Sequence, residues 1–307
     1  MGKAPVTSVK RKLKVAIIGS GNIGTDLLIK VLRSPHLECG AFIGRNLSSS
    51  GMTKALSLGV PVSAEGISYI VNNPDCCDIV FDATSAKSHF EHAPVLRKLD
   101  KRVIDMTPAK IGLMSVPSVN MADCLSEFNV NMVTCGGQAS IPVAYAIGQT
   151  QTDVDYVEVV SSIASRSAGP ATRQNLDEYI KTTEDGLKEF SGAARTKAIL
   201  NLNPAEPCVD MQTTIFAKVA NPDIPKLEQR LSLLVKDVQQ YVPGYEVILG
   251  PIFDNGRIVV MVRVRGLGDY LPAYAGNLDI INCAAIAMAE EYARVTLDNE
   301  LKGIDGA

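Results

Sequence analysis

The sequence lacks the features of a membrane protein, a secreted protein and a nucleic-acid-binding protein. No segment of the chain reaches the roughly 20 apolar residues that a membrane span needs, and the N-terminus has no apolar signal region. Neither sign of charge is in large excess: the formal net charge is −3 and the sequence pI is about 5.7. The 7 cysteines show no framework spacing, which fits a reducing compartment. We therefore expect a soluble, cytoplasmic protein without nucleic-acid or membrane partners.

A glycine-rich turn near the N-terminus indicates a dinucleotide site. The apolar run Leu13–Ile18 is followed at once by Gly19-Ser20-Gly21-Asn22-Ile23-Gly24 and then by apolar residues at helical spacing. This order of strand, glycine turn and helix is the one that a dinucleotide-binding βαβ unit requires. In such a unit Gly19 permits the tight turn, Gly21 lets a pyrophosphate approach the backbone, and Gly24 lets the helix pack on the strand.

The position that selects between NAD and NADP carries no acid. Such units usually have an acidic residue roughly 20 positions further on, which binds the ribose 2′-hydroxyl. Here the second predicted strand, residues 37–43, ends in Gly44-Arg45-Asn46. Arg45 either meets a 2′-phosphate, which favours NADP, or is a solvated loop arginine while the amide of Asn46 contacts the ribose. The sequence leaves these two readings equally open.

A cysteine lies where a predicted strand passes into a predicted helix. Residues 130–134 have the pattern of a strand, and residues 141–149, with Pro142 in the first turn, have the pattern of a helix. At Cys135 the unpaired N–H groups and the positive end of the helix dipole favour a thiolate, and the same N–H groups could hold an oxyanion. Gly136-Gly137 leaves room for a substrate carbonyl. A buried, inert thiol is the alternative, because free cysteines are among the most buried residues.

The remaining pattern predicts two sheets. Strand and helix signals alternate up to Cys135, which indicates an α/β domain with a doubly wound parallel sheet of the Rossmann type. Longer β-branched runs then accompany an amphipathic helix at 225–241, which indicates a second, α+β domain with a mixed sheet. We predict a dinucleotide-binding domain at 1–134, a second domain at 135–274, and a C-terminal helix at 275–307 that returns to the first domain.

Long segments of the chain resemble the acylating acetaldehyde dehydrogenases. They are Val15–Leu27, Asn129–Ala139, Ser165–Arg173, Asn203–Pro207 and Tyr270–Asp279. The resemblance covers nearly the whole chain and implies a semialdehyde-dehydrogenase-like fold whose second domain is the catalytic and dimerisation domain. It implies oxidation of acetaldehyde, or another short aldehyde, to an acyl-CoA, with NAD (or NADP) as cofactor and coenzyme A as co-substrate. It also implies a homodimer within a complex with a 4-hydroxy-2-oxovalerate aldolase, which delivers the aldehyde through a tunnel.

The resemblance assigns residues as well. It makes Cys135 the nucleophile that carries an acyl thioester. The dinucleotide contacts that it implies are Gly21, Asn22, Ile23, Gly24, Ser167, Ala168, Gly169, Pro170, Ala171, Thr172, Arg173, Gln174, Asn175 and Asn277. No metal is expected. His89 and His92 lie three apart on a predicted helix without other evident ligands, so we interpret them as solvated or capping residues.

The chemistry expected from the residues agrees with this implication. A Cys135 thiolate attacks the aldehyde, backbone N–H groups or the Gln138 amide hold the oxyanion, and a hydride leaves for the nicotinamide ring. Coenzyme A then resolves the thioester through its own sulfur. The phosphorylating semialdehyde and glyceraldehyde-phosphate relatives use a histidine base downstream of their cysteine. All 3 histidines of this chain precede Cys135, so catalysis relies on the helix terminus, the cofactor charge or a carboxylate.

Two positions depart from the family pattern. Many members carry an acid where this chain has Arg45-Asn46. The acid that the family has after Pro207 falls at Thr213 here, and the acid nearby is Asp210. Asp210 is a candidate for deprotonating the incoming thiol from a shifted position. The alternatives are weak turnover of coenzyme A or an exposed turn aspartate without a catalytic role.

Other polar residues keep two readings each. Arg166 and Arg173 flank a glycine-proline turn. One interpretation is that they bind phosphates or a substrate carboxylate, and the other is that each only pairs with a surface acid. Asp82 and Asp105 end predicted strands and are structural caps or hydrogen-bonding residues beside the cofactor.

Three hypotheses for function follow. The favoured one is a CoA-acylating aldehyde dehydrogenase. The second is a dehydrogenase of the same architecture that uses another aldehyde or releases the free acid. The third is a catalytically weak, dinucleotide-binding partner subunit of an aldolase.

Overall fold

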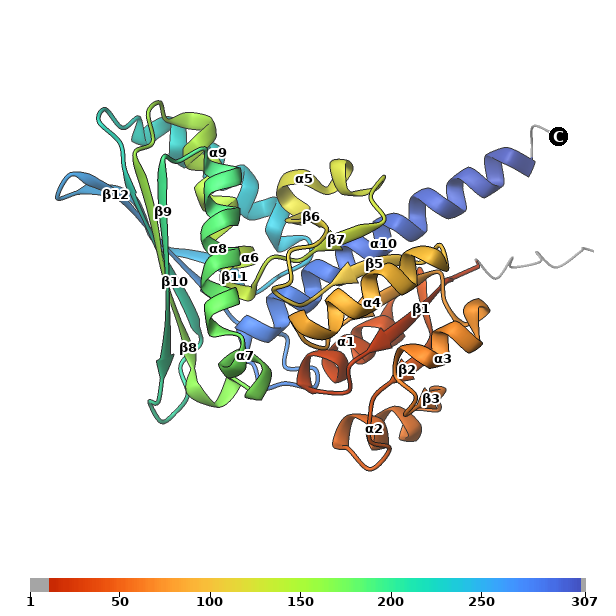
Figure 1. Cartoon of the computed structure of the whole chain (residues 1–307). Coiled ribbons are helices and arrows are strands. Elements are labelled where there is room, and N and C mark those ends of the chain that lie inside the picture. The colour runs from red at the N-terminus through yellow and green to blue at the C-terminus, as the bar shows by residue number, and fades with distance from the viewer. Residues whose placement is uncertain (1–10, 305–307) are drawn as a thin grey trace, which may run out of the picture.

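The computed structural model describes residues 11–304, and its first sheet is the predicted parallel one (Figure 1). The order of its strands is β3-β2-β1-β4-β5-β7-β6. These strands are β1 (Leu13–Ile18), β2 (Leu37–Ile43), β3 (Val62–Ser63), β4 (Ile79–Asp82), β5 (Arg102–Asp105), β6 (Leu113–Met114) and β7 (Asn129–Asn131). The connecting helices are α1 (Asn22–Arg33), α2 (Ser50–Ser57), α3 (Ile67–Asn72), η1 (Pro74–Cys76), α4 (Ala86–Lys98) and α5 (Pro117–Cys124). The doubly wound Rossmann-type arrangement is confirmed.

The second sheet is mixed, as predicted, and has the order β11-β12-β10-β8-β9. Its strands are β8 (Tyr156–Ala164), β9 (Arg195–Asn203), β10 (Met211–Lys218), β11 (Tyr245–Asp254) and β12 (Arg257–Val264), of which β8 and β9 pair in parallel and the other pairs are antiparallel. The helices of this region are α6 (Cys135–Thr150), η2 (Ser165–Ser167), α7 (Pro170–Gln174), α8 (Leu176–Ser191) and α9 (Ile224–Gln239).

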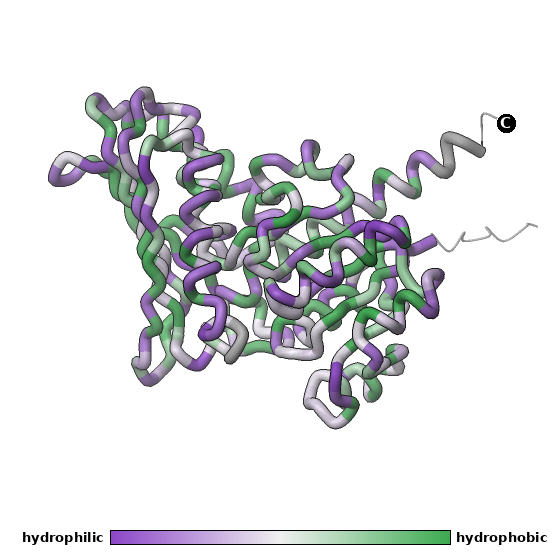
Figure 2. The backbone as a smooth tube through the Cα atoms, in the orientation of Figure 1, coloured by the Kyte–Doolittle hydropathy of each residue, from purple (hydrophilic) through white to green (hydrophobic). Residues whose placement is uncertain are grey.

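Helices cover one face of this sheet and leave the other face open. Figure 1 shows α6, α8 and α9 between the mixed sheet and the parallel sheet, and no helix of the described chain on the outer face. The side chains of β10 alternate accordingly: Met211 and Thr213 are buried beneath the helices, while Gln212 is exposed. Figure 2 shows hydrophobic segments running through the strands, with hydrophilic residues along the outward side of α8. The sheet is therefore packed on one side only.

The last helix, α10 (Gly276–Ile304), joins the two hydrophobic cores. Ile280 and Cys283 pack in the core of the mixed sheet, whereas Ala284 and Met288 pack in the core of the parallel sheet. Its small side chains allow close approach to α1, beside which it runs. Because α10 is buried on more than one side, it is apolar around much of its circumference.

A buried lysine fixes the start of α10 to α1. The Lys30 ammonium lies 3.0 Å from Asp26, 3.0 Å from Asp269 and 2.7 Å from Asp279. A buried ammonium is stable only when it is paired. Burial by itself lowers the Lys30 pKa, but the charges of Cys283, Asp279 and Asp26 outweigh it and raise the pKa above its usual value. The ion-pair cluster thereby holds the helix of the glycine turn against the segment that precedes α10.

Helix α6 starts earlier than the sequence pattern predicts. It begins at Cys135, so Pro142 lies in the helix interior instead of the first turn. The Thr134 hydroxyl accepts a 2.8 Å hydrogen bond from the Gly137 N–H and caps the helix there. The strand before it ends at Asn131. No helix within the described residues is long and apolar enough to cross a membrane.

Candidate active site

A cavity of about 310 Å³ lies between the two sheets, at the carboxyl ends of the parallel strands. The residues that line it are Gly21, Asn22, Ile23, Ala83, Thr84, Ser85, Met106, Thr107, Pro108, Val133, Thr134, Cys135, Ser167, Gly169, Thr172, Asn175, Tyr179, Leu278 and Ile281. This edge is where doubly wound sheets bind ligands. Of the residues predicted from sequence, those that lie behind or outside this lining are Gly19, Gly24, Arg45, Gln138, Ala168, Arg173, Gln174, Asp210 and Asn277, and the side chains of Pro170 and Ala171 lie outside the described part of the chain.

The glycine turn has the geometry that its sequence suggests. Gly19 has a φ of 116°, and a Cβ there would lie 2.4 Å from the Ala83 carbonyl oxygen. A Cβ on Gly24 would lie 1.8 Å from the Gly19 carbonyl oxygen, so only glycine allows the turn and α1 to pack this closely. At Gly21, in contrast, a Cβ would meet no atom within 4 Å. The backbone is therefore accessible at Gly21, where α1 begins.

The segment after β2 leaves the choice of dinucleotide open. Arg45 is exposed, and the Asn46 side chain accepts a 2.9 Å hydrogen bond from the Ser48 N–H. Behind the cavity lining, the Oδ1 atom of buried Asn277 has no hydrogen-bond partner among the described residues. Asn277 thus offers a free acceptor next to Leu278 of the cavity lining.

The loop between β8 and α8 is held by its own backbone and by Arg173. The Arg173 guanidinium donates to the carbonyl of Ala168 at 3.0 Å and to that of Ser165 at 3.1 Å. Arg166 instead forms an exposed ion pair of 2.7 Å with Glu206. Arg166 therefore follows the surface-pair reading, whereas Arg173 braces the loop that brings Ser167 to the cavity.

Cys135 is the first residue of α6 and faces the cavity. The turn before it is strained, because Val133 is a β-branched residue with a φ of 58°. The Cys135 sulfur lies 3.7 Å from the hydroxyl of Tyr179. The backbone N–H groups of Cys135 and Gly136 lie at the same helix start and, after the Tyr179 contact, are the groups that lower the pKa of the thiol. Burial raises the Cys135 pKa, and the Tyr179 hydroxyl and these N–H groups offset that rise only in part. The expected thiolate is thus stabilised by the predicted N–H groups but opposed by burial in this state.

The Gln138 amide is engaged away from the cysteine. Its Nε2 atom donates to the Ser115 carbonyl at 2.7 Å and to the Met132 carbonyl at 2.9 Å. Both amide N–H donors are therefore in use, and Gln138 fixes α6 to the ends of the neighbouring strands. Of the two oxyanion donors that we considered, the backbone N–H groups at the helix terminus are favoured by this geometry.

Thr213 is buried within the mixed sheet, whereas Asp210 lies just before β10. Thr213 is buried, with its hydroxyl 3.0 Å from that of Ser161 on the adjacent strand. A Cβ on Gly136 would in turn lie 3.1 Å from the Ser161 hydroxyl. Asp210 directly precedes β10 and is half-buried. It lies two residues before exposed Gln212, whereas buried Thr213 belongs to the opposite face of the strand. Ser161 thus lies between Thr213 and the first turn of α6, and neither Thr213 nor Asp210 lines the cavity.

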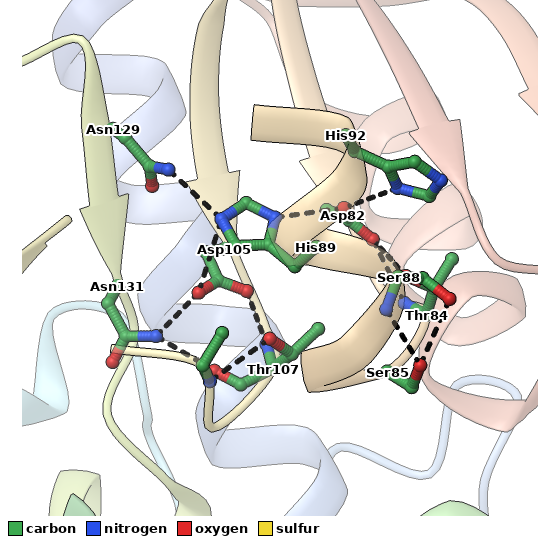
Figure 3. A network of polar contacts seen from close by, with 11 residues as sticks. Asp82, Thr84, Ser85, Ser88, His89, His92, Asp105, Thr107, Asn129 and Asn131 are labelled. Atoms are coloured by element: carbon green, nitrogen blue, oxygen red, sulfur yellow. Dashed lines mark hydrogen bonds and ion pairs between the residues drawn. The ribbon is translucent and has the colours of Figure 1, made fainter. Parts of the chain in front are cut away.

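A buried polar network supports the loops that follow β4 and β5 (Figure 3). The His89 Nδ1 atom lies 2.9 Å from Asp82, and its Nε2 atom lies 2.9 Å from the Asn129 amide and 3.5 Å from Asp105. His92 contacts the same Asp82 oxygen at 2.8 Å. His89 is fully buried, so our expectation of a solvated or capping residue is wrong for it: α4 turns the imidazole inward onto the strand-end carboxylate.

The charges of this network are strongly coupled. Burial opposes ionisation of Asp82, but hydrogen bonds from His89 and His92 hold its pKa below the usual range. Burial by itself lowers the His89 pKa. The hydrogen bond to Asp82 and the charge of Asp105 have the larger effect, so the net pKa of His89 lies above its usual value. Burial raises the pKa of Asp105 to about 6. Through Thr84 and Thr107, which bond to Asp82 and Asp105, the network shapes two loops of the cavity.

Tyr179 is the site residue that sequence reasoning missed. It lies on α8, 44 positions after Cys135, in a segment with an ordinary amphipathic pattern. No motif distinguishes it from a core tyrosine.

Comparison with known proteins agrees with the geometry. A family model described as "Semialdehyde dehydrogenase, NAD binding domain" matches residues 14–123, and one described as "Prokaryotic acetaldehyde dehydrogenase, dimerisation" matches residues 135–272. Among solved structures, an aspartate semialdehyde dehydrogenase II from Vibrio cholerae shares the fold with a TM-score of 0.60 at 14% identity, covering 92% of this chain and 99% of that one. The aspartate semialdehyde dehydrogenase of Candida albicans has a TM-score of 0.62 at 13% identity, covering 91% and 100%.

Curated relatives are much more similar in sequence. The acetaldehyde dehydrogenase of Spirochaeta aurantia is 66% identical over 294 residues, which are 96% of this chain and 98% of the relative. That of Pectobacterium atrosepticum is 58% identical over 287 residues, or 93% and 97%. With such similarity over nearly its whole length, and with a cysteine at a helix terminus facing a dinucleotide-type glycine turn, this chain belongs to the acetaldehyde dehydrogenase family.

Proposed function

We propose that this chain oxidises acetaldehyde, or another short aldehyde, to the corresponding acyl-CoA through a thioester on Cys135. The observation that carries the proposal is a single cavity lined both by Cys135 and by the start of the glycine-turn helix at Gly21. A substrate bound to the sulfur and a dinucleotide bound at the turn would meet in this space. The family membership supports the same reaction.

The residues present fit a nicotinamide dinucleotide. The first N–H groups of α1 have no side-chain cap, and the backbone at Gly21 is open, so a pyrophosphate can approach the positive helix end. The unpartnered Asn277 Oδ1 atom is a further acceptor for a polar ligand. When bound, the nicotinamide ring supplies the acceptor for the hydride. NAD is our preferred cofactor, and NADP is the alternative if Arg45 binds a 2′-phosphate.

Cys135 performs the covalent step. Its thiolate adds to the aldehyde carbon, and N–H groups at the start of α6 hold the resulting oxyanion. Loss of the hydride leaves a thioester on the sulfur. The thiol of coenzyme A then attacks this thioester and releases Cys135 as a thiolate, which the same N–H groups stabilise. Asp210 remains our predicted candidate for the base that deprotonates coenzyme A. It does not line the cavity, so its position supports this role less than its place in the sequence does.

We also propose the assembly and the domain limits. The open face of the mixed sheet, with exposed Ile199 on β9 and half-buried Phe216 on β10, is suited to a homodimer, and the matched dimerisation model supports one. A 4-hydroxy-2-oxovalerate aldolase is the proposed hetero-oligomeric partner. Free cysteines and the use of coenzyme A support a cytoplasmic location. The division into 1–134, 135–274 and 275–307 is supported by the separation of the strands into two sheets.

The test is nicotinamide reduction by the purified protein with acetaldehyde, using NAD and NADP in parallel, each with and without coenzyme A. Turnover that requires coenzyme A supports the acylating reaction, and the preferred dinucleotide decides the role of Arg45. Turnover that ignores coenzyme A would replace the proposal by a dehydrogenase that releases the free acid. Dinucleotide binding without turnover of any short aldehyde would leave the partner-subunit role.

A further inference from the structure

We propose that the Tyr179 hydroxyl is a catalytic hydrogen-bond donor that stabilises negative charge first on the Cys135 sulfur and then on the aldehyde oxygen. The inference rests on the proposed function, because it names the side chain that assists that reaction. Besides the backbone N–H groups of α6, the side chains that sequence suggests for this task do not reach the sulfur: the histidines lie upstream, and the Gln138 amide donates to two carbonyls. By our interpretation of the sequence, Thr213 takes the place of the family's acid.

The position of the hydroxyl is the first argument. Its oxygen lies 3.7 Å from the Cys135 sulfur, and a Cβ on Gly136 would lie only 2.1 Å from it. The phenol therefore packs directly against the first turn of α6, in a space that a side chain at Gly136 would fill. Among the side chains that the structure describes, Tyr179 alone forms a hydrogen bond with the sulfur. Tyr179 also lines the cavity.

The second argument is that two helices hold this contact in register. The Thr183 hydroxyl donates to the Tyr179 carbonyl at 2.7 Å and lies 2.8 Å from the hydroxyl of Thr134, the cap residue of α6. The start of α6 is thus hydrogen-bonded to the turn of α8 that carries the tyrosine. Such support keeps a donor and a reacting atom within the narrow range of geometry that catalysis needs.

The third argument concerns protonation. Tyr179 is buried, and burial together with the neighbouring Cys135 raises its pKa well above the usual value. The group therefore stays a phenol and acts as a donor, not as a base. When Cys135 is a thiol, its S–H donates to the phenol oxygen; when it ionises, the phenol O–H donates to the sulfur, which favours the thiolate.

The assisted step balances in atoms and electrons. The sulfur lone pair forms the S–C bond, and the π pair of the carbonyl moves to oxygen, where the phenol O–H donates to the new charge. The C=O bond then re-forms from that pair as the hydride leaves with two electrons for the nicotinamide cofactor of the proposed function. The product is the thioester on Cys135, and Tyr179 keeps its proton throughout.

The experiment is the pH dependence of iodoacetamide alkylation, followed by mass spectrometry on the peptide that contains Cys135. In Tyr179→Phe we expect the alkylation midpoint to rise by about one pH unit or more, because a charge-assisted hydrogen bond is lost. The same variant should lose about tenfold or more in kcat for acetaldehyde, with the KM for the dinucleotide little changed. Tyr245→Phe is the matched control, since its buried hydroxyl donates to the Ala139 carbonyl on α6, away from the sulfur, and its loss should leave the midpoint in place.

Site-specific incorporation of 3-fluorotyrosine at position 179 gives a second variant of nearly the same shape. It is a stronger donor, so it should lower the alkylation midpoint, the opposite of Tyr179→Phe; a residue with only a packing role would move neither. Unchanged midpoints in both variants, with normal turnover in Tyr179→Phe, would overturn this inference and leave the proposed function intact. Shifted midpoints in the two variants, together with a wild-type protein that oxidises no aldehyde, would support the Tyr179 contact and overturn the proposed function.

Discussion

Replacing His89 by leucine should destabilise the protein strongly, because the imidazole lies between two carboxylates that water does not reach. Asp82, His89 and Asp105 all have side chains with 0% exposure. In the variant, Asp82 keeps its bonds from Thr84 and His92, and Asp105 keeps its bond from the Thr107 N–H. The variant loses three things: the hydrogen bond from His89 to Asp82, the hydrogen-bond partner of the Asn129 amide, and any positive charge on the imidazole near Asp105.

The magnitude follows from these losses. A hydrogen bond to a charged group contributes about 1.5–3 kcal/mol, and leaving the buried Asn129 amide without a partner costs about 1–3 kcal/mol. If His89 is an imidazolium, the loss is that of a buried ion pair, about 3–5 kcal/mol. The first route gives about 2.5–6 kcal/mol in total, a range that contains the second, so we expect a loss of about 3–5 kcal/mol. At roughly 2 °C per kcal/mol for a chain of this size, the melting temperature should fall by roughly 6–10 °C.

The assay is thermal unfolding by calorimetry, with urea unfolding as a second measure of the free energy. Since the network supports the Thr84 and Thr107 loops of the cavity, His89→Leu should also weaken dinucleotide binding. His36→Gln is the control, because this half-buried histidine lies outside the network and its replacement should change stability by only about 0.5 kcal/mol or less. A loss below about 1 kcal/mol in His89→Leu would refute the reasoning, since it would mean that the carboxylates do not need the imidazole.

Three further predictions follow from the site. Cys135→Ala should abolish aldehyde oxidation and leave dinucleotide binding, measured by calorimetric titration, unchanged; retained turnover would exclude Cys135 as the nucleophile. Gly24→Ala should destabilise the protein by about 1–3 kcal/mol in urea unfolding because its Cβ meets the Gly19 carbonyl, whereas Gly21→Ala should leave stability within about 0.5 kcal/mol and weaken dinucleotide binding; equal stabilities would contradict the packing argument. Because burial raises the pKa of Asp105 to about 6 in the folded state, the native protein retains a proton that the unfolded chain releases. This contribution to stability is present near pH 4 and is lost as the pH rises through 6. Asp105→Asn should remove that part of the pH dependence, and an unchanged slope of the unfolding free energy between pH 4 and 7 would count against it.

Local sequence patterns predict much of the fold. The glycine turn follows an apolar strand directly, and its three glycines have separate steric reasons that hold for any strand-turn-helix unit, so this element could be placed residue by residue. Alternating strand and helix signals likewise predict a parallel sheet, and β-branched runs predict the mixed one. Both rest on periodicity, which each segment carries within itself.

Contacts between distant segments limit prediction of the site. The start of α6 depends on a cap by Thr134, and Pro142 gave a misleading signal because proline is commonest in the first turn of a helix. Gln138 has a side chain suited to an oxyanion, but its amide is engaged by the carbonyls of Ser115 and Met132. The position of His89 along α4 gives no sign that it is buried. Its burial becomes evident only from its contact with Asp82 at the end of β4. Tyr179 has no local signature, since its relation to Cys135 exists only once α8 lies against α6.

The most direct test of the central claim is to look for the acyl group on Cys135. The purified protein would be mixed with acetaldehyde and the preferred dinucleotide without coenzyme A, quenched in acid, digested and examined by mass spectrometry. The proposed function predicts an acetyl group on the peptide that carries Cys135 and its release as acetyl-CoA when coenzyme A is added before the quench. Reduction of the dinucleotide by acetaldehyde with Cys135 unmodified at every time point, in the wild-type protein, would contradict the claim.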